Sequence, residues 1–150
     1  MKNRIMAIGL MLLTLVLLIP TTTSAAPATP GAFISCNPHP SKPYVASVPA
    51  GYLRFRGVAY CNYSLPGLSM KLHAKFNIIN KFETSYYVAS SQKWHCGPCQ
   101  QIGPHSFTVW PSPGRGYYWT EMELWCPSCN VIKYTRSHSK PCYFNGEVCW

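Results

Sequence analysis

The chain has 150 residues, of which 47% are hydrophobic and 11% charged, and its 13 Lys plus Arg exceed its 4 Asp plus Glu to give a formal net charge of +9. This length favours one compact domain, and 10 Tyr, 6 Phe and 5 Trp argue against a disordered chain. There is no Asp, and the acids are Glu83, Glu121, Glu123 and Glu147. Mechanisms that need a Ser–His–Asp triad, paired Asp or a carboxylate-rich Mg²⁺ or Ca²⁺ site therefore fit poorly.

The first residues have the three parts of a secretory signal peptide. Lys2 and Arg4 precede an apolar run over 5–19, and small polar residues follow Pro20. The run is shorter than the roughly 20 residues that a membrane span needs. We expect residues 1–25 to be a signal peptide cleaved after Ala25, with cleavage after Ala28 as the second choice and an uncleaved anchor as the alternative. We therefore expect a secreted, extracellular protein with no later transmembrane segment.

Cysteines dominate the predicted mature chain. Residues 26–150 carry 11 basic and 4 acidic side chains, a net charge of +7, and all eight cysteines. An even number of cysteines in a short exported chain predicts a disulfide framework, and each bridge stabilises a fold by about 2–4 kcal/mol. The residues expected to form these bridges are Cys36, Cys61, Cys96, Cys99, Cys126, Cys129, Cys142 and Cys149.

The pattern along the chain predicts an arm and one β domain. Residues 26–50 are rich in proline, which predicts an extended arm attached through Cys36, and 51–150 form a single disulfide-rich domain. Alternation of apolar and polar residues predicts strands at 52–61, 68–77 and 117–126, and composition predicts shorter ones at 84–89, 107–110 and 131–135. The side chains expected to face inward from the first and last of the three longer strands are Leu53, Phe55, Gly57, Ala59, Cys61, Tyr118, Thr120, Met122, Leu124 and Cys126.

Short strands, regular turns and the lack of a capped helical stripe predict an all-β fold, an antiparallel β-sandwich or barrel. The same alternation puts Cys61 and Cys126 on the apolar faces of their strands, so a bridge between two sheets is geometrically natural. An early strand that ends in Cys61 and a late strand that opens with Gly116, Tyr117 and Tyr118 and ends in Cys126 resemble immunoglobulin-like domains over about residues 50–135. The resemblance implies a disulfide-stabilised antiparallel sandwich, immunoglobulin-like or similar.

The segment from Trp94 to Pro104 contains a CGPC string at residues 96–99 that is similar to the thioredoxin active site. The resemblance implies Cys96 as nucleophile and Cys99 as resolving thiol of a secreted thiol–disulfide oxidoreductase. That chemistry needs a helix whose N-terminus lowers the thiol pKa, and Pro104, Pro111 and Pro113 leave no room for one. We expect a structural pair in a tight turn and keep the oxidoreductase as the alternative.

A zinc site is the alternative for the two CxxC pairs. Tetrahedral Zn²⁺ takes four thiolates at about 2.3 Å, and Cys96, Cys99, Cys126 and Cys129 supply that number. The export signal favours oxidised sulfurs, so we expect neither metal nor cofactor. The five histidines are expected to be isolated surface residues: His39, His73, His95, His105 and His138.

Glu121 and Glu123 share one face of the strand at 117–126, and we expect them to pair with Arg54 and Arg56 rather than to act as a glycosidase pair. Trp119 and Trp125 flank these acids and suggest an aromatic platform for sugar rings, although rings that cover the edge of the core are the alternative. The residues expected to bind a partner are Trp119, Trp125, Arg54, Arg56, Lys71 and Lys75.

The positive charge favours an acidic partner: an anionic glycan, a cell-wall polymer or a lipid surface. No nucleic-acid reader motif is present, so nucleic acid is not expected. Asn62, Tyr63 and Ser64 form a glycosylation sequon that is used only in a eukaryotic secretory pathway. The sequence predicts a secreted, non-enzymatic binding or interaction module, with the oxidoreductase and a small basic toxin or antimicrobial protein as alternatives.

Overall fold

The computed structural model describes residues 34–129 and 135–150, and its regular structure there consists of strands alone. The nine strands are β1 (Cys36–Val45), β2 (Leu53–Leu65), β3 (Leu68–Asn77), β4 (Tyr86–Ser90), β5 (Trp94–Cys96), β6 (Cys99–Val109), β7 (Gly116–Trp125), β8 (Thr135–His138) and β9 (Cys142–Phe144). The described residues include no helix long and apolar enough to cross a membrane. The expected signal peptide lies outside them.

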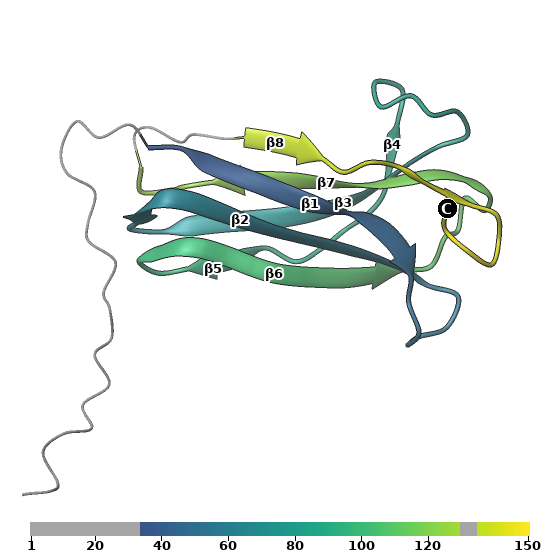
Figure 1. Ribbon diagram of the computed structural model, residues 1–150, viewed down its shortest axis with the longest axis horizontal. Helices are drawn as coiled ribbons and strands as arrows, with labels where there is room; N and C mark the ends of the chain where they lie inside the picture. Colours follow the sequence, from purple (N-terminus) through teal and green to yellow (C-terminus); the bar gives the residue numbers. More distant parts are fainter. Residues whose placement is uncertain (1–33, 130–134) are drawn as a thin grey trace, which may run out of the picture.

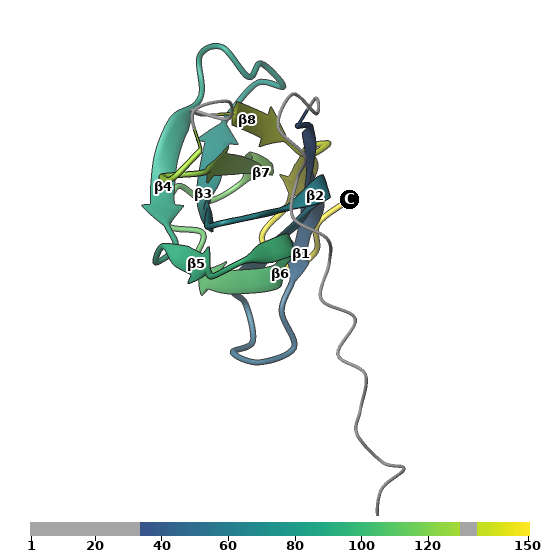
Figure 2. The same ribbon diagram turned by 90° about the vertical axis from the view of Figure 1, so that its left-hand side faces the viewer.

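The strands form two antiparallel sheets that pack face to face (Figure 1, Figure 2). The smaller sheet has the order β1-β2-β6. The larger has the order β4-β3-β7-β8, with β5 also beside β3 and β9 also beside β7. This arrangement confirms the predicted all-β antiparallel sandwich.

Alternation explains how the sheets bury their inner faces. The inward sets predicted for β2 and β7 are buried in the structure, so the period-2 pattern identified the core correctly. Gly57 of β2 lies where the sheets approach closely, because a Cβ there would be 2.7 Å from Leu72 Cδ2 and 3.0 Å from Met122 Sδ. Glycine thus provides the space that the opposite sheet fills.

The described part of the proline-rich arm is mostly strand. β1 pairs with β2 at the edge of the smaller sheet, a position that tolerates proline because the free side of the strand needs no N–H donor. Its pairing shifts between Ser41 and Tyr44, and there the Thr120 hydroxyl of the opposite sheet donates a 2.7 Å hydrogen bond to the Ser41 carbonyl. The buried Thr120 therefore ties the irregular part of β1 to β7.

All eight cysteines are paired, as expected, in four disulfides: Cys36–Cys61, Cys96–Cys99, Cys126–Cys129 and Cys142–Cys149. The suggested Cys61–Cys126 bridge between the sheets is wrong. Cys61 lies opposite Cys36 in the β1–β2 register, while the turn after β7 brings Cys129 back to Cys126. Four intramolecular disulfides indicate an oxidising environment of the extracellular type.

The shorter strands differ more from the prediction. The strand expected at 84–89 is β4, shifted towards the C-terminus, and the one expected at 107–110 is the end of the much longer β6. The sequence did not predict β5 or β9, each of three residues. The strand expected at 131–135 lies outside the described residues except for Thr135, where β8 begins.

Candidate functional site

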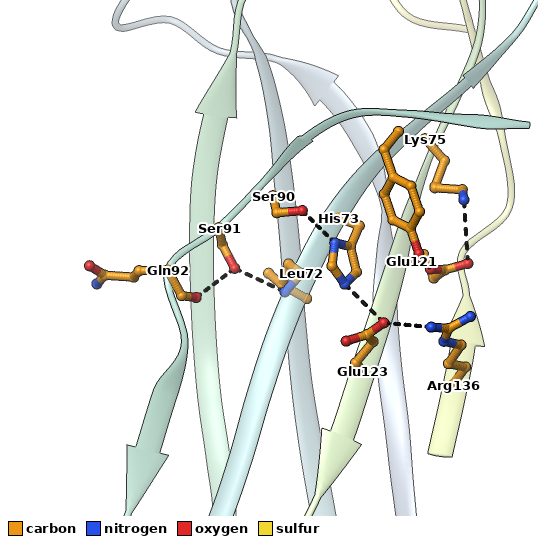
Figure 3. A network of polar contacts seen from close by, with 10 residues as sticks. Leu72, His73, Lys75, Ser90, Ser91, Gln92, Glu121, Glu123 and Arg136 are labelled. Carbon is orange, nitrogen blue, oxygen red and sulfur yellow. Dashed lines mark hydrogen bonds and ion pairs between the residues drawn. The ribbon is translucent and has the colours of Figure 1, made fainter. Parts of the chain in front are cut away.

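A cluster of charged side chains lies on the outer face of the larger sheet, where β3 and β7 pair (Figure 3). The register sets His73 opposite Glu121 and Lys71 opposite Glu123, so the histidine and both acids are neighbours. Arg136 approaches from β8, the strand on the other side of β7. We call His73, Lys75, Glu121, Glu123 and Arg136 the polar cluster.

His73 is the centre of the polar cluster and is 4% exposed. Its Nδ1 shares a 2.6 Å hydrogen bond with the Ser90 hydroxyl, and its Nε2 lies 3.2 Å from Glu123 Oε1 without a hydrogen bond to any group. Ser91 fixes the segment that holds Ser90, because its hydroxyl accepts from the Leu72 amide at 2.9 Å and donates to the Gln92 carbonyl at 2.7 Å (Figure 3). The expectation of an exposed His73 is therefore wrong.

The two carboxylates bind different cations. The Tyr87 hydroxyl donates to Glu121 Oε1 at 3.0 Å, and Lys75 Nζ lies 3.9 Å from Glu121 Oε2 and 3.6 Å from the centre of the Tyr87 ring. Burial and this hydrogen bond raise the pKa of Tyr87. Arg136 donates to Glu123 Oε1 at 3.0 Å. The expected pairing of the acids with Arg54 and Arg56 is wrong, because those arginines belong to β2 in the other sheet.

Trp119 and Trp125 do not form an exposed aromatic platform, and for Trp119 the structure agrees with the alternative of a ring that covers the core. Trp119 is on the outer face of β7 but only 1% exposed, and the Phe82 ring of the loop after β3 meets it edge to face at 4.8 Å. Trp125 is half-buried, with Lys93 Nζ 5.1 Å from its ring. Among the expected binding cations, Arg54 and Arg56 lie on β2 and Lys71 and Lys75 on β3, so the six expected residues are divided between the two sheets.

Both CxxC pairs are disulfides in the structure. The alternative of a four-thiolate zinc site is contradicted, because Cys96, Cys99, Cys126 and Cys129 are oxidised within their own CxxC turns. Cys96 and Cys99 flank the turn between β5 and β6, and within 34–129 and 135–150 no helix starts beside them. The dipole that activates a thioredoxin-type thiol is missing from this turn.

The other histidines pack individually against neighbouring side chains. His95 Nδ1 lies 3.0 Å from the Ser69 hydroxyl, and His138 stacks on Phe82 at 4.1 Å. His105 stacks on Trp94 at 4.7 Å, and burial lowers the pKa of His105. These contacts do not bring the remaining histidines into the polar cluster.

The structure also shows a surface that the sequence pattern does not predict. Large apolar side chains are exposed in four loops or tails that follow β1, β3, β6 and β9. The exposed fraction is 74% for both Val48 and Ile78, 58% for Trp110 and 70% for Trp150. We call this set the apolar end; its members are Val48, Ile78, Ile79, Trp110, Val148 and Trp150.

Strand directions bring the apolar end together. Val45 pairs with Leu53 and Leu53 with Val109, while Asn77 pairs with Tyr117 and Gly116 with Phe144. The loops that continue from these residues therefore emerge at the same end of the sandwich, the right-hand end in Figure 1 that also carries the C-terminus. A pair of adjacent isoleucines in a predicted loop, at 78 and 79, was the sequence signal for this surface.

The comparisons with known proteins add no relative. No protein-family model, curated protein or solved structure matches this chain.

Proposed function

We propose that this chain is a secreted, non-enzymatic binding module whose apolar end attaches to a negatively charged lipid surface. The observation that carries the proposal is the gathering of exposed apolar side chains in four neighbouring loops of one rigid sandwich. Exposed apolar residues scattered singly need no explanation, but a concentration of them at one place is typical of an interaction site.

Charge supports an anionic partner. Ten Lys or Arg lie within 34–129 and 135–150, and Lys75 and Arg136 face the two acids of the polar cluster. The described residues contain eight other Lys or Arg but only two other acids, Glu83 and Glu147. Because half of the acidic groups lie in the polar cluster, the rest of the described surface is strongly positive. A cation close to an anionic lipid surface contributes about 1 kcal/mol to binding.

Cations also lie beside the apolar side chains themselves. Lys81 is in the loop with Ile78, and Arg115 is in the loop that follows Trp110. The Arg54 guanidinium donates a 3.0 Å hydrogen bond to the Val48 carbonyl, which places its charge at the base of the first loop. Apolar tips with basic groups behind them match an interface between hydrocarbon and anionic headgroups.

The loops are held in position rather than loosely attached. Trp150 exchanges backbone hydrogen bonds of 3.0 and 3.2 Å with Tyr143, and the Cys142–Cys149 disulfide closes the same segment. Trp110 packs edge to face on Tyr52, 5.4 Å away. A preorganised surface loses less conformational entropy on binding, so these contacts favour attachment.

The residue types favour lipid over sugar. Four of the six members of the apolar end are aliphatic, namely Val48, Ile78, Ile79 and Val148, whereas rings that stack on sugars are aromatic. Removing one such side chain fully from water stabilises a complex by about 1.5–3 kcal/mol. Binding to an anionic polysaccharide instead of lipid is the alternative that the experiment must distinguish.

Co-sedimentation with vesicles tests the proposal. We expect the protein to bind vesicles that contain phosphatidylglycerol more tightly than vesicles of phosphatidylcholine alone, and the double substitution Ile78→Ser, Ile79→Ser to weaken binding at least tenfold. Tyr60→Ser is the matched control, because Tyr60 is 48% exposed but lies in the middle of β2. Equal binding of the double variant, or retention on an anionic polysaccharide without binding to vesicles, would overturn the proposal.

Two further assays, one with the same vesicles and one with insulin, address the two other functions that the sequence suggested. A toxin or antimicrobial protein would release a trapped dye on binding, whereas a binding module leaves the vesicles sealed. An oxidoreductase would catalyse reduction of insulin disulfides by dithiothreitol through Cys96 and Cys99, and we expect no acceleration. Dye release or catalysed reduction would favour the respective alternative.

A further inference from the structure

We propose that His73, Glu121 and Glu123 of the polar cluster bind one divalent transition-metal ion, of which Zn²⁺ is the representative. This site is on the outer face of the larger sheet and is separate from the apolar end. The ligand atoms of the three side chains all lie within 4.8 Å of one another. The proposal therefore goes beyond surface attachment and does not depend on it.

The strongest observation is the unsatisfied nitrogen of His73. The side chain is 6% exposed, and its Nε2 has no hydrogen-bond partner although it faces Glu123 Oε1 at 3.2 Å. If the Nδ1–H donates to Ser90, the Nε2 lone pair points at a carboxylate oxygen, and the two repel unless a cation lies between them. A metal ion supplies that cation, and the competing explanation is the other tautomer, in which Nε2 carries the ring N–H and Nδ1 accepts from Ser90.

Ser90 is in the position that a metal-binding histidine requires. Histidine ligands almost always donate their other ring N–H to a fixed acceptor, which selects the tautomer and orients the ring. His73 Nδ1 has such a partner 2.6 Å away in the Ser90 hydroxyl. The T-shaped contact with the Tyr87 ring at 4.9 Å also restrains the imidazole. The histidine is thus held with Nε2 directed at the two acids.

The donor set suits Zn²⁺ better than Ca²⁺ or Mg²⁺. One imidazole and two carboxylates match the nitrogen and oxygen ligands of zinc, which binds them at about 2.0–2.2 Å. Ca²⁺ takes about 6–8 oxygen ligands and Mg²⁺ needs a near-octahedral oxygen shell, and this cluster has too few acids for either. Three protein ligands leave a fourth position for water, as in zinc sites with an open coordination position.

Lys75 and Arg136 compete with the metal. Lys75 Nζ lies 3.9 Å from Glu121, and the Arg136 guanidinium lies 3.0 Å from Glu123. A divalent ion must displace both from the carboxylates, which the 55% exposed side chain of Arg136 can accommodate by turning to solvent. Removing Arg136 should therefore tighten metal binding, whereas a merely structural role of Arg136 predicts no gain in affinity.

Titration of the folded, disulfide-bonded chain without an affinity tag, first freed of metal by a chelator, tests the proposal with ZnCl₂ as the probe. We expect one Zn²⁺ per chain by calorimetry, with no comparable heat for Mg²⁺ or Ca²⁺. His73→Gln and Glu123→Gln should weaken binding at least tenfold, and Arg136→Gln should strengthen it several-fold. Glu83→Gln and His39→Gln are matched controls, because both residues are exposed and outside the polar cluster.

Folding of each variant must be checked, so that loss of Zn²⁺ binding is not caused by unfolding. Far-ultraviolet circular dichroism and the absence of free thiols identify variants that retain the sandwich, and Glu121→Gln provides a second test if the buried His73→Gln fails to fold. Absence of Zn²⁺ binding by the wild type, or unchanged binding in folded Glu121→Gln and Glu123→Gln variants, would overturn the proposal. His73 would then carry its ring N–H on Nε2, and its Nδ1 would accept from the Ser90 hydroxyl.

Discussion

Single residues decide how closely the two sheets and their turns approach. Gly116 opens β7 with a φ of +154°, and a Cβ there would collide with the Phe76 ring and lie 3.0 Å from the Asn77 carbonyl oxygen. Gly97, in the turn between Cys96 and Cys99, has nothing within 4 Å of an added Cβ. A Cβ therefore fits at position 97 without any change, whereas at position 116 it requires the Phe76 ring to move.

We predict that Gly116→Ala lowers the free energy of unfolding by about 1–3 kcal/mol, because overpacking displaces the buried Phe76. Gly97→Ala should change it by less than about 0.5 kcal/mol. Urea denaturation of the oxidised proteins measures both values. Equal effects of the two substitutions would contradict the close approach seen at Gly116.

Trp119 and Trp150 provide a second contrast. Trp119→Ala removes a ring that is 1% exposed, so we expect a loss of about 3–5 kcal/mol in the free energy of unfolding. Trp150→Ala removes a ring that is 70% exposed, so stability should change little while vesicle binding weakens. Thermal denaturation paired with co-sedimentation separates the two effects. A stable Trp119→Ala variant would show that this ring does not pack as the structure indicates.

His105 gives a pH dependence with a defined sign. Burial lowers its pKa in the folded state below the ordinary value of 6.5. When the pH falls through about 6.5, the unfolded chain takes up the proton first, so stability decreases on acidification and is unaffected by His105 at higher pH. His105→Gln should remove this part of the pH dependence. An NMR titration midpoint of His105 at or above 6.5 would contradict the assignment.

For the strands, alternation of apolar and polar residues predicts the long strands and their inward faces. It does not predict the short strands or which strands are neighbours in a sheet. β2, β3 and β7 have long alternating patterns and were found. β6 was underestimated because Gly103 and Pro104 interrupt its pattern, and β5 and β9 have too few residues to show a period. The inward faces follow directly from the pattern, whereas the order of strands within a sheet does not.

In the polar cluster too, alternation predicts the face of the strand on which a residue lies but not the strand that pairs with it. Alternation placed Glu121 and Glu123 correctly on the outer face of β7, but no local pattern reveals that β3, rather than β2, is its neighbour. His73 and Lys75 therefore replace the expected arginines as partners. Trp119 was also correctly placed on that face, yet Phe82 of a distant loop buries it, a tertiary contact that strand periodicity does not encode.

The disulfides differ in how much they contribute to the free energy of unfolding, because they close chain loops of different length. Cys36–Cys61 joins residues separated by 25 positions, and Cys126–Cys129 joins residues separated by three. In the chain-entropy description, removing the first bridge with two Cys→Ser substitutions costs about 3.5 kcal/mol and removing the second about 2 kcal/mol. Urea denaturation of the two double variants tests the order. A greater loss from Cys126→Ser, Cys129→Ser would contradict it.

The whole molecule has two chemically different ends. The turns at Cys96–Cys99 and after Cys126 lie at one end, and the apolar end with its neighbouring cations lies at the other. The two packed sheets run between these ends and keep them apart, so a protein attached through the apolar end, as proposed, would have a defined orientation. The polar cluster lies on the outer face of the larger sheet, between these two ends, so the proposed lipid contact at the apolar end would not cover it.

Paramagnetic broadening of backbone amides by a spin-labelled lipid, measured on the protein bound to phosphatidylglycerol-containing bicelles, tests the attachment most directly. We predict strong broadening in the loops of Val48, Ile78, Trp110 and Trp150, and none at the Cys96–Cys99 turn. Broadening centred on the Cys96–Cys99 turn, or spread evenly over the molecule, would contradict it.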